Sequence, residues 1–358
     1  QTINGTLSTT GTAGNRRVFF TTATYGISYD LVVNSAPSLT DADFRGLYVR
    51  GTAAPISGTR IGNRGECRGI TFSTPKTVYW NFLTNSNWSG NVWAASSGGA
   101  VSTDNFPLAQ DTAIINNTGL NTSAIVSLDN ALAYAPNIDL SGRTNAMTFA
   151  FTANTAIYGS FTCGSGVTIA SPGVLTFSGG TTQTITSAGK TFTCPITVDT
   201  YGGTVQLADA LDIGSNALTV TNGTFNTAGF AVTASTLSST NSNVRTINLG
   251  ASTLTLATAN FINFGTSTNL TFNAGTSQIN GTGSGSISFA GGGQTFYNVA
   301  YTSTGSSNTF IINGGNTFNN LTITAPASAA ITALSFSANQ TINGTLTCAG
   351  ASAVRRIF

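Results

Sequence analysis

The sequence predicts an all-β protein: a parallel β-solenoid, by analogy a right-handed β-helix, that carries a Trp-containing insertion of strands and loops. Only 7% of its 358 residues are charged, and His is absent. No stretch has a useful helical period, whereas short runs of alternating apolar and polar residues recur between glycines. A hydrophobic content of 40%, with 22 Phe, excludes a disordered polar chain.

Two strand patterns recur along the chain. In the first, Gly-x-Thr-Phe precedes alternating apolar residues, and two of its copies place Phe296 and Phe318 22 residues apart. In the second, an apolar-Ser/Thr-Phe strand is followed a few residues later by Gln, as from Leu334 to Gln340. The irregular spacing fits a solenoid, whose corner loops vary in length, and excludes a propeller of equal blades. At about 22 residues per coil, the chain would hold roughly 16 coils.

The scarcity of charge also fits stacked coils. Each strand of a parallel solenoid pairs with its equivalent in the coils before and after it, so inward Phe, Leu, Ile and Val stack while Thr, Ser and Asn face solvent. Like charges stacked ~4.8 Å apart would repel each other. From Gly214 to Val354, Arg245 is the only charged residue.

The end of the chain repeats its beginning. Gln340–Phe358 aligns with Gln1–Phe19 without a gap, and eleven of the nineteen pairs are identical. The simplest interpretation is one unit, plus the start of the next, cut from a tandem array whose neighbouring units stack end to end. An exposed strand ladder at each end then becomes a joint instead of an aggregation hazard. The residues predicted to form this joint are Gln1, Ile3, Leu7, Phe19, Gln340, Ile342, Leu346 and Phe358.

Composition divides the chain into three parts. Residues 1–59 are predicted to form the first solenoid coils, 60–118 a Trp-rich insertion or cap, and 119–358 a continuous solenoid whose last part, 340–358, repeats 1–19. The second part contains all three Trp and the only Glu.

One stretch resembles a known module. The residues that carry this resemblance are Tyr79-Trp80, Asn87-Trp88-Ser89, Trp93, Ser97-Gly98-Gly99, Pro107 and Asp111 to Ile115. A similar order of residues accompanies β-helical repeats in large secreted bacterial adhesins and phage fibre-like proteins. Leu39–Phe44 and Gly69–Phe72 are similar to stretches of phage structural proteins, so the resemblance covers about Leu39 to Gly119. It implies an extracellular, cell-surface or virion setting.

The aromatic cluster has two interpretations. Exposed rings of Tyr79, Trp88 and Trp93 would stack on the sugars of a cell-surface or matrix glycan, which gives a phage tail-fibre or adhesin module as the alternative function. We favour the other interpretation, in which Trp80, Trp88 and Trp93 pack together as a miniature core or cap, because three Trp this close in sequence can bury one another.

The chain offers little for catalysis. Cleavage of a glycosidic bond needs two carboxylates on one face, and the candidates are Asp41 with Asp43, near Arg45, and Asp209 with Asp212. Without His no Ser-His-Asp triad can form, and the Gly-rich runs lack the Lys-Ser/Thr of a phosphate loop. We therefore expect no catalytic residue, no metal and no cofactor, with a polysaccharide depolymerase as the least favoured alternative.

The remaining features concern partners. A net charge of +2 with scattered basic residues predicts no nucleic-acid partner, and apolar runs far shorter than about 20 residues predict no membrane span. The four Cys lack zinc spacing. Pairing of Cys163 with Cys194 and burial of both as thiols remain equal alternatives. The sequence thus predicts a structural, non-catalytic fibre unit whose main partner is another copy of itself.

Overall fold

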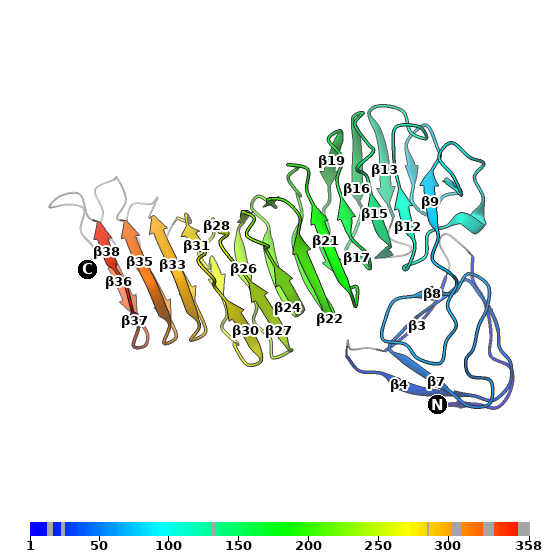
Figure 1. The fold of residues 1–358 in the computed structure, drawn as a ribbon, viewed down its shortest axis with the longest axis horizontal. Coiled ribbons are helices and arrows are strands. Elements are labelled where there is room, and N and C mark those ends of the chain that lie inside the picture. Colours follow the sequence, from blue (N-terminus) through cyan, green and yellow to red (C-terminus); the bar gives the residue numbers. More distant parts are fainter. Residues whose placement is uncertain are drawn as a thin grey trace. The chain divides into compact units, whose positions relative to one another are not determined.

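The protein is a parallel β-solenoid of about 13 turns, as the sequence predicts (Figure 1). The right-handed twist of the coils stays a prediction. The computed structural model describes residues 1–12, 17–22, 26–129, 134–284, 286–302, 309–324 and 333–349. Two compact units divide the chain, Gln1–Thr184 and Ile185–Phe358.

The first three coils of unit 1 build three parallel sheets, which appear as the sides of a triangle in the blue part of Figure 1. Every pairing between them is parallel, as expected of stacked coils. The first sheet contains β1 (Thr2–Ile3), β4 (Tyr29–Val33) and β7 (Leu47–Arg50); the second contains β2 (Ser8–Thr10) and β5 (Ser38–Thr40); the third contains β3 (Val18–Thr21), β6 (Ala42–Arg45) and β8 (Gly62–Asn63).

The later coils of unit 1 continue with three parallel stacks of strands. One stack contains β9 (Thr77–Trp80), β12 (Thr112–Ile114), β15 (Asn137–Asp139) and β18 (Phe161–Thr162); a second contains β10 (Ser86–Asn87), β13 (Ala124–Leu128), β16 (Met147–Phe151) and β19 (Val167–Ala170); a third contains β14 (Tyr134–Ala135), β17 (Thr155–Ile157) and β20 (Leu175–Phe177). β21 (Thr182–Thr186) spans the boundary between the units.

The Trp-rich segment is only partly an insertion. Its strands β9 and β12 pair in parallel like any two coils. Between them the chain forms β10, β11 (Trp93–Ala94), which runs antiparallel to β9, and a short 3-10 helix, η1 (Thr103–Asn105). The strands that begin and end this excursion therefore belong to the solenoid itself.

Unit 2 stacks its coils through two long parallel ladders. One ladder contains β22 (Ile196–Leu207), β24 (Ala217–Asn226), β26 (Thr236–Ser238), β27 (Arg245–Asn248), β29 (Ile262–Asn263), β30 (Leu270–Asn273), β32 (Ile287–Ala290), β34 (Thr309–Asn313) and β36 (Ala333–Phe336). The other contains β23 (Leu211–Asp212), β25 (Val232–Ala234), β28 (Thr253–Leu256), β31 (Gln278–Gly281), β33 (Thr295–Thr302), β35 (Thr317–Thr324), β37 (Thr341–Ile342) and β38 (Leu346–Ala349).

The interior consists of stacked apolar side chains. Phe296 and Phe318, predicted to lie one coil apart, are direct partners in register, and their rings stack with centroids 5.8 Å apart. The prediction of 16 coils was too high because other coils are longer. Thr2 pairs with Val32, and Ser86 pairs with Val126 across the Trp-rich excursion.

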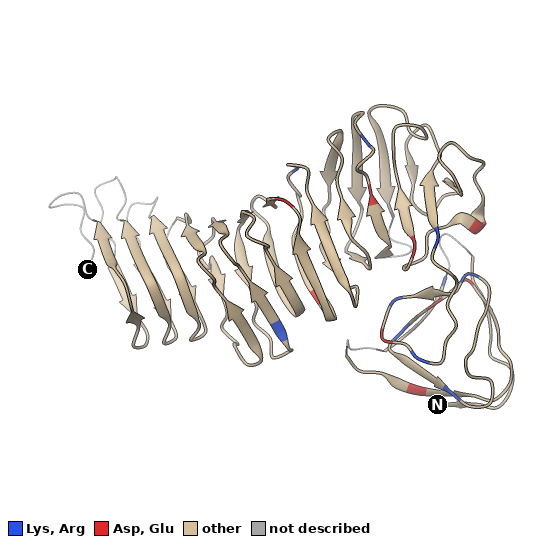
Figure 2. Ribbon diagram, viewed as in Figure 1, with Lys and Arg blue, Asp and Glu red and all other residues tan. Residues whose placement is uncertain are grey.

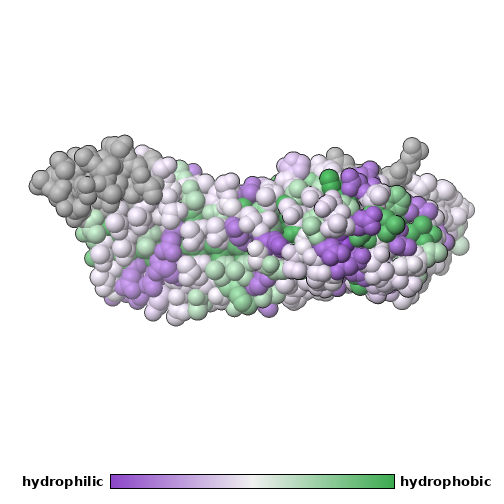
Figure 3. Space-filling model, turned by 90° about the horizontal axis from the view of Figure 1, so that it is seen from above, coloured by the Kyte–Doolittle hydropathy of each residue, from purple (hydrophilic) through white to green (hydrophobic). Residues whose placement is uncertain are grey.

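Charge is distributed unevenly between the coils. Figure 2 shows many charged residues in the first coils of unit 1 but only Arg245 among the strands from β24 to β38. On the face seen in Figure 3, pale colours of intermediate hydropathy predominate, as expected where Ser, Thr and Gly face solvent.

In each unit a buried arginine far from any carboxylate partner ties backbone carbonyls together. In unit 1 the Arg143 guanidinium donates to the carbonyl oxygens of Leu120 (2.7 Å) and Asn121 (2.6 Å). In unit 2 Arg245 donates to the carbonyl of Thr268 (2.7 Å). Burial lowers the pKa of both guanidinium groups from its usual range. These arginines fix corners where the carbonyls would otherwise lack donors.

Candidate functional site

The two copies of the repeated sequence adopt the same local structure. In the first copy, β1 is followed by a bend at Gly5 and by β2. In the second copy, β37 is followed by a bend at Gly344 and by β38, at equivalent positions. β1 and β2 are the edge strands of their sheets, whereas β37 and β38 both pair with β35 at the other end of the described chain. The two copies thus share the same succession of strand, bend and strand, although β1 and β2 belong to two sheets whereas β37 and β38 belong to one.

The backbone of the first copy bonds to the coil that follows it. The carbonyl of Gln1 accepts from the N–H of Val32 (2.8 Å), and the carbonyl of Ile3 accepts from the N–H of Asn34 (3.1 Å). In the second strand, the carbonyl of Leu7 accepts from the N–H of Ser38 (2.9 Å) in the same way. The backbone groups of these odd-numbered residues thus point toward the following coil.

The backbone of the second copy bonds to the coil before it. The N–H of Thr341 donates to the carbonyl of Asn316, and the N–H of Asn343 donates to the carbonyl of Phe318; each distance is 2.9 Å. Thr341 and Asn343 are the equivalents of Thr2 and Asn4, not of Gln1 and Ile3. Because alternate residues of a parallel strand face opposite neighbours, the two copies use complementary edges of the same coil.

The glutamine that opens the second copy has a role that sequence reasoning missed. The Gln340 amide nitrogen donates to the carbonyl of Gly314 (2.6 Å), and its oxygen accepts from the N–H of Asn316 (3.1 Å). Gln183, which follows a Phe in the same pattern, donates likewise to the carbonyl of Ile157 (2.9 Å) one coil earlier. Gln278 and Gln294, which also follow a Phe, donate within their own coil instead, to Asn280 and to the carbonyl of Gly292, so the Phe-to-Gln pattern alone does not predict the clamp.

The predicted joint residues lie at the two ends of the described chain. Ile3 and Leu7 are half-buried and pack against the core of the first coils, and Phe19 is 38% exposed. Ile342 is half-buried, whereas Leu346 is 46% exposed although its partner Leu321 is fully buried. Phe358 lies outside the described residues. The last described coil thus presents apolar side chains that no later described strand covers.

A buried ion cluster fixes the first coil to the second. Arg17 donates to Asp43 (2.7 Å) and to Asp41 (3.1 Å), and all three side chains are nearly inaccessible to solvent. Arg60 and Arg64, from the next stretch of chain, complete the cluster through Asp41 (2.6 Å) and Asp43 (2.9 Å). Burial opposes the charge of Arg17, but the neighbouring carboxylates raise its pKa overall.

The cluster also explains local details of the backbone. Asp41 has a φ of 53°, a left-handed conformation that Asp tolerates and that places its carboxylate beside two arginines. A Cβ at Gly62 would collide with the carboxylate of Asp43, so only Gly fits there. The Arg64 guanidinium lies between the rings of Phe19 and Tyr134, 4.0 and 3.9 Å from their centroids.

The carboxylates considered for catalysis are therefore occupied. Asp41 and Asp43 are 1% and 0% exposed and are held by arginines, which leaves neither open to a sugar. Arg45, predicted to lie near them, donates instead to the carbonyl of Thr22 (2.9 Å).

The second carboxylate pair serves turns in unit 2. Asp209 accepts from the backbone N–H of Ser187 (2.7 Å), and Asp212 accepts from the Thr191 hydroxyl (2.7 Å).

The Trp cluster packs as a miniature core, as favoured. Trp80, Trp88 and Trp93 are each 1% exposed, and the Trp93 ring meets those of Trp88 and Trp80 edge-on at 4.5 and 5.4 Å. The stacking of Trp88 and Trp93 on a glycan was thus wrong, because neither buried ring offers a face to a sugar. Tyr79 is half-buried on β9. Cys163 and Cys194 are buried thiols, so the disulfide alternative is not realised.

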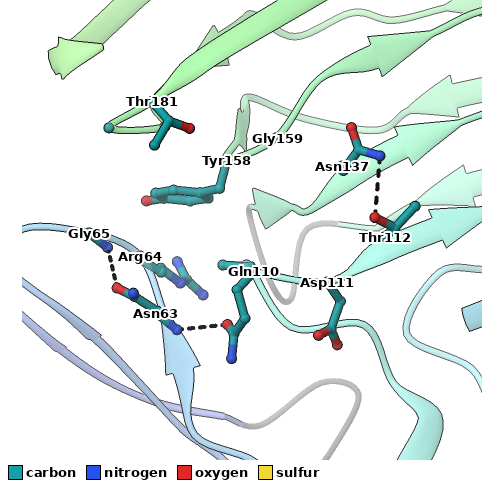
Figure 4. A pocket seen from close by; sticks show the side chains of 13 residues that line it. Asn63, Arg64, Gly65, Gln110, Asp111, Thr112, Asn137, Tyr158, Gly159 and Thr181 are labelled. Carbon is teal, nitrogen blue, oxygen red and sulfur yellow. Dashed lines mark hydrogen bonds between the residues drawn. The ribbon is translucent and has the colours of Figure 1, made fainter. Parts of the chain in front are cut away.

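A pocket of about 390 Å³ opens in unit 1 beside Arg64, Gln110 and Tyr158 (Figure 4). Its polar groups already bind other parts of the chain. The Gln110 side chain accepts from the N–H of Asn63 (2.9 Å), and Asp111 is paired with Lys76 (2.9 Å). We assign it a structural role between coils.

Comparisons with known proteins add no relative. A scan against protein-family models, a search of curated proteins and a search of solved structures each find no match to this chain. Among the described residues, no helix is long and apolar enough to cross a membrane.

Proposed function

We propose that the chain is a structural, non-catalytic unit that assembles end to end with other copies of itself into a fibre. The observation that carries this proposal is the pair of complementary edges. The same sequence occurs at both ends of the chain and forms a strand, a bend and a strand each time. The backbone of Gln1–Thr10 bonds to the coil that follows it, whereas the backbone of Gln340–Ala349 bonds to the coil before it. The resemblance of the segment 79–115 supports a fibre outside the cell or on a virion.

The composition of the ends supports assembly without charge. β38 is exposed along its whole length, and Phe336 is 47% exposed beside it in the last coil. An exposed ladder of this kind recruits a further strand by backbone hydrogen bonds. The strands that would meet, Gln1–Thr10 and Gln340–Ala349, contain no charged side chain, so screening by salt should affect their pairing little.

Sedimentation velocity and electron microscopy of the purified chain test this function. We expect species that grow with concentration in steps of the 36.5 kDa unit and appear as linear particles at both low and high salt. The variant Ile342→Lys places a charge on the inward face of the last coil and should return the protein to monomers. Thr341→Lys, whose side chain points outward, is the matched control and should still assemble. A wild-type chain that stays monomeric at every concentration would refute the proposal.

A further inference from the structure

The complementary edges define how two copies meet. We propose that Gln340–Ala349 of one copy lies parallel to, and in register with, Gln1–Thr10 of the next, so that identical residues stack. This register rests on the proposed end-to-end assembly and adds the partner surface to it. The occupant of the last coil is then a second copy of this chain, bound through its first coil.

The hydrogen-bonding pattern permits this register. In the first copy Thr2 pairs with Val32 because Gln1 and Ile3 bond to Val32 from either side. In the second copy the backbone N–H groups of Thr341 and Asn343 bond to β35. The backbone N–H and C=O groups of the corresponding residues, Gln340 and Ile342, therefore point away from β35. The partner's Thr2 therefore pairs with Thr341, with its N–H donated to the carbonyl of Gln340.

The side chains match at the same register. Ile342 falls on the inward face, as Ile3 does, so the two stack as one more layer of the core. Asn343 falls over the partner's Asn4, and amide ladders between coils recur in this chain. Asn34 donates to Asn4, and Asn320 donates to Asn298, both at 2.9 Å. Stacks of identical residues with Asn ladders are a stable arrangement of parallel strands.

A second geometry, in which the last coil replaces the first coil of the partner, is less favourable. It would have to displace Gln1–Phe19, with the buried contacts of Arg17 to Asp41 and Asp43, before Arg356, the equivalent of Arg17 in the second copy, could take its place. Stacking in register breaks none of these contacts and adds a new ladder at an open edge.

Cysteine cross-linking in the full chain distinguishes these geometries. Cys348, an exposed thiol on β38, is the equivalent of Thr9 and would lie opposite it in the neighbouring copy. Neighbouring parallel strands are about 4.8 Å apart, within the Cα separation of a disulfide. Diamide oxidation of Thr9→Cys should give a ladder of covalent multimers on a non-reducing gel, because each copy then carries one thiol at each end.

The controls use neighbouring positions of the same strands. Ser8→Cys, on the opposite face of β2, should give at least about tenfold less multimer, since its thiol points away from Cys348. Thr9→Cys combined with Cys348→Ser should give none. A short bismaleimide repeats the test without the geometric demands of a disulfide.

The possible results separate the register from the function. Multimers with Leu39→Cys and none with Thr9→Cys would overturn the register in favour of replacement, because Thr9 itself pairs with Leu39. Covalent dimers of the wild-type chain through Cys348 alone would show tail-to-tail contact and also overturn it. An assembling protein that cross-links at none of these positions refutes the register but leaves the fibre. A protein that never assembles refutes the fibre itself.

Discussion

The first coils and the last coils of this chain hold adjacent strands together by different chemistry. Around Arg17, buried guanidinium groups and carboxylates of successive coils pair with one another. After Gly214, stacked rings such as Phe296 on Phe318 and amide ladders such as Asn320 on Asn298 take their place. Neutral layers repeat indefinitely without repulsion, whereas an ion cluster needs a specific set of partners.

The difference bears on what each end can do. The ion cluster ties the first coil firmly to the second, so this coil acts as a fixed surface. The last described coil is held by backbone ladders and by the Gln340 clamp, and its apolar side chains are exposed. In the proposed end-to-end stacking, the first coil would supply a surface fixed by its ion cluster and the last described coil an apolar layer.

The largest effect should follow from breaking the ion cluster with Asp43→Asn. Asp43 is fully buried and accepts hydrogen bonds from both Arg17 and Arg64, so the variant leaves two buried cations short of a counter-charge. We expect the free energy of unfolding of unit 1 to fall by about 3 to 5 kcal/mol. Trp fluorescence during urea unfolding measures this unit alone, because all three Trp lie in it.

The matched control for this change is Asp30→Asn. Asp30 also pairs with an arginine, Arg50, but both side chains are more than half exposed. This variant should unfold like the wild type. Equal loss in both variants would show that burial of the charges is not what stabilises the first coils.

The sequence predicted the repeating coils of this fold but not the ion cluster around Arg17. The one-coil spacing of Phe296 and Phe318 was readable because stacked layers repeat the same residue types. The pairing of Asp41 with Arg60 was not, because their contact depends on the lengths of irregular corner loops and on the left-handed backbone at Asp41. The same irregularity hid the length of the first coils.

The terminal repeat shows the same limit at the candidate site. The alignment of Gln1 with Gln340 predicted a joint, and the strand patterns predicted that the second copy is an ordinary coil. The sequence could not predict which backbone edge of each copy forms hydrogen bonds. The two copies are alike in sequence, so the edge that is used depends on which neighbouring coil is present.

An intermediate effect should follow from Asn320→Ala in the neutral coils. The Asn320 amide joins three successive coils, since it donates to Asn298 and accepts from the N–H of Thr345, both at 2.9 Å. We expect a loss of about 0.5 to 1.5 kcal/mol, concentrated in the last coil. Hydrogen exchange of residues 341–349 should quicken accordingly, whereas Thr322→Ala on the same strand should leave it unchanged. Exchange that stays slow would show that the ladder is not what holds the last coil.

The smallest effect at neutral pH, and a distinct one at high pH, should follow from Tyr134→Phe. Tyr134 is 1% exposed, its ring packs on the Arg64 guanidinium, and its hydroxyl makes only a long hydrogen bond of 3.4 Å to the carbonyl of Pro107. The loss at neutral pH should therefore stay below about 1 kcal/mol.

High pH separates the two proteins. Burial raises the pKa of the Tyr134 phenol, the nearby Asp43 carboxylate raises it further, and the arginines beside it offset only part of the shift. The folded protein thus favours the neutral phenol, so its contribution to stability is complete below the unfolded pKa of about 10 and is lost as the pH rises above it. Wild-type unit 1 should lose up to about 1.4 kcal/mol per pH unit there relative to Tyr134→Phe, measured by urea unfolding at stepwise pH. Parallel pH profiles of the two proteins would mean that the phenol gains solvent before it ionises, and that the coils around the ion cluster are not firmly closed at high pH.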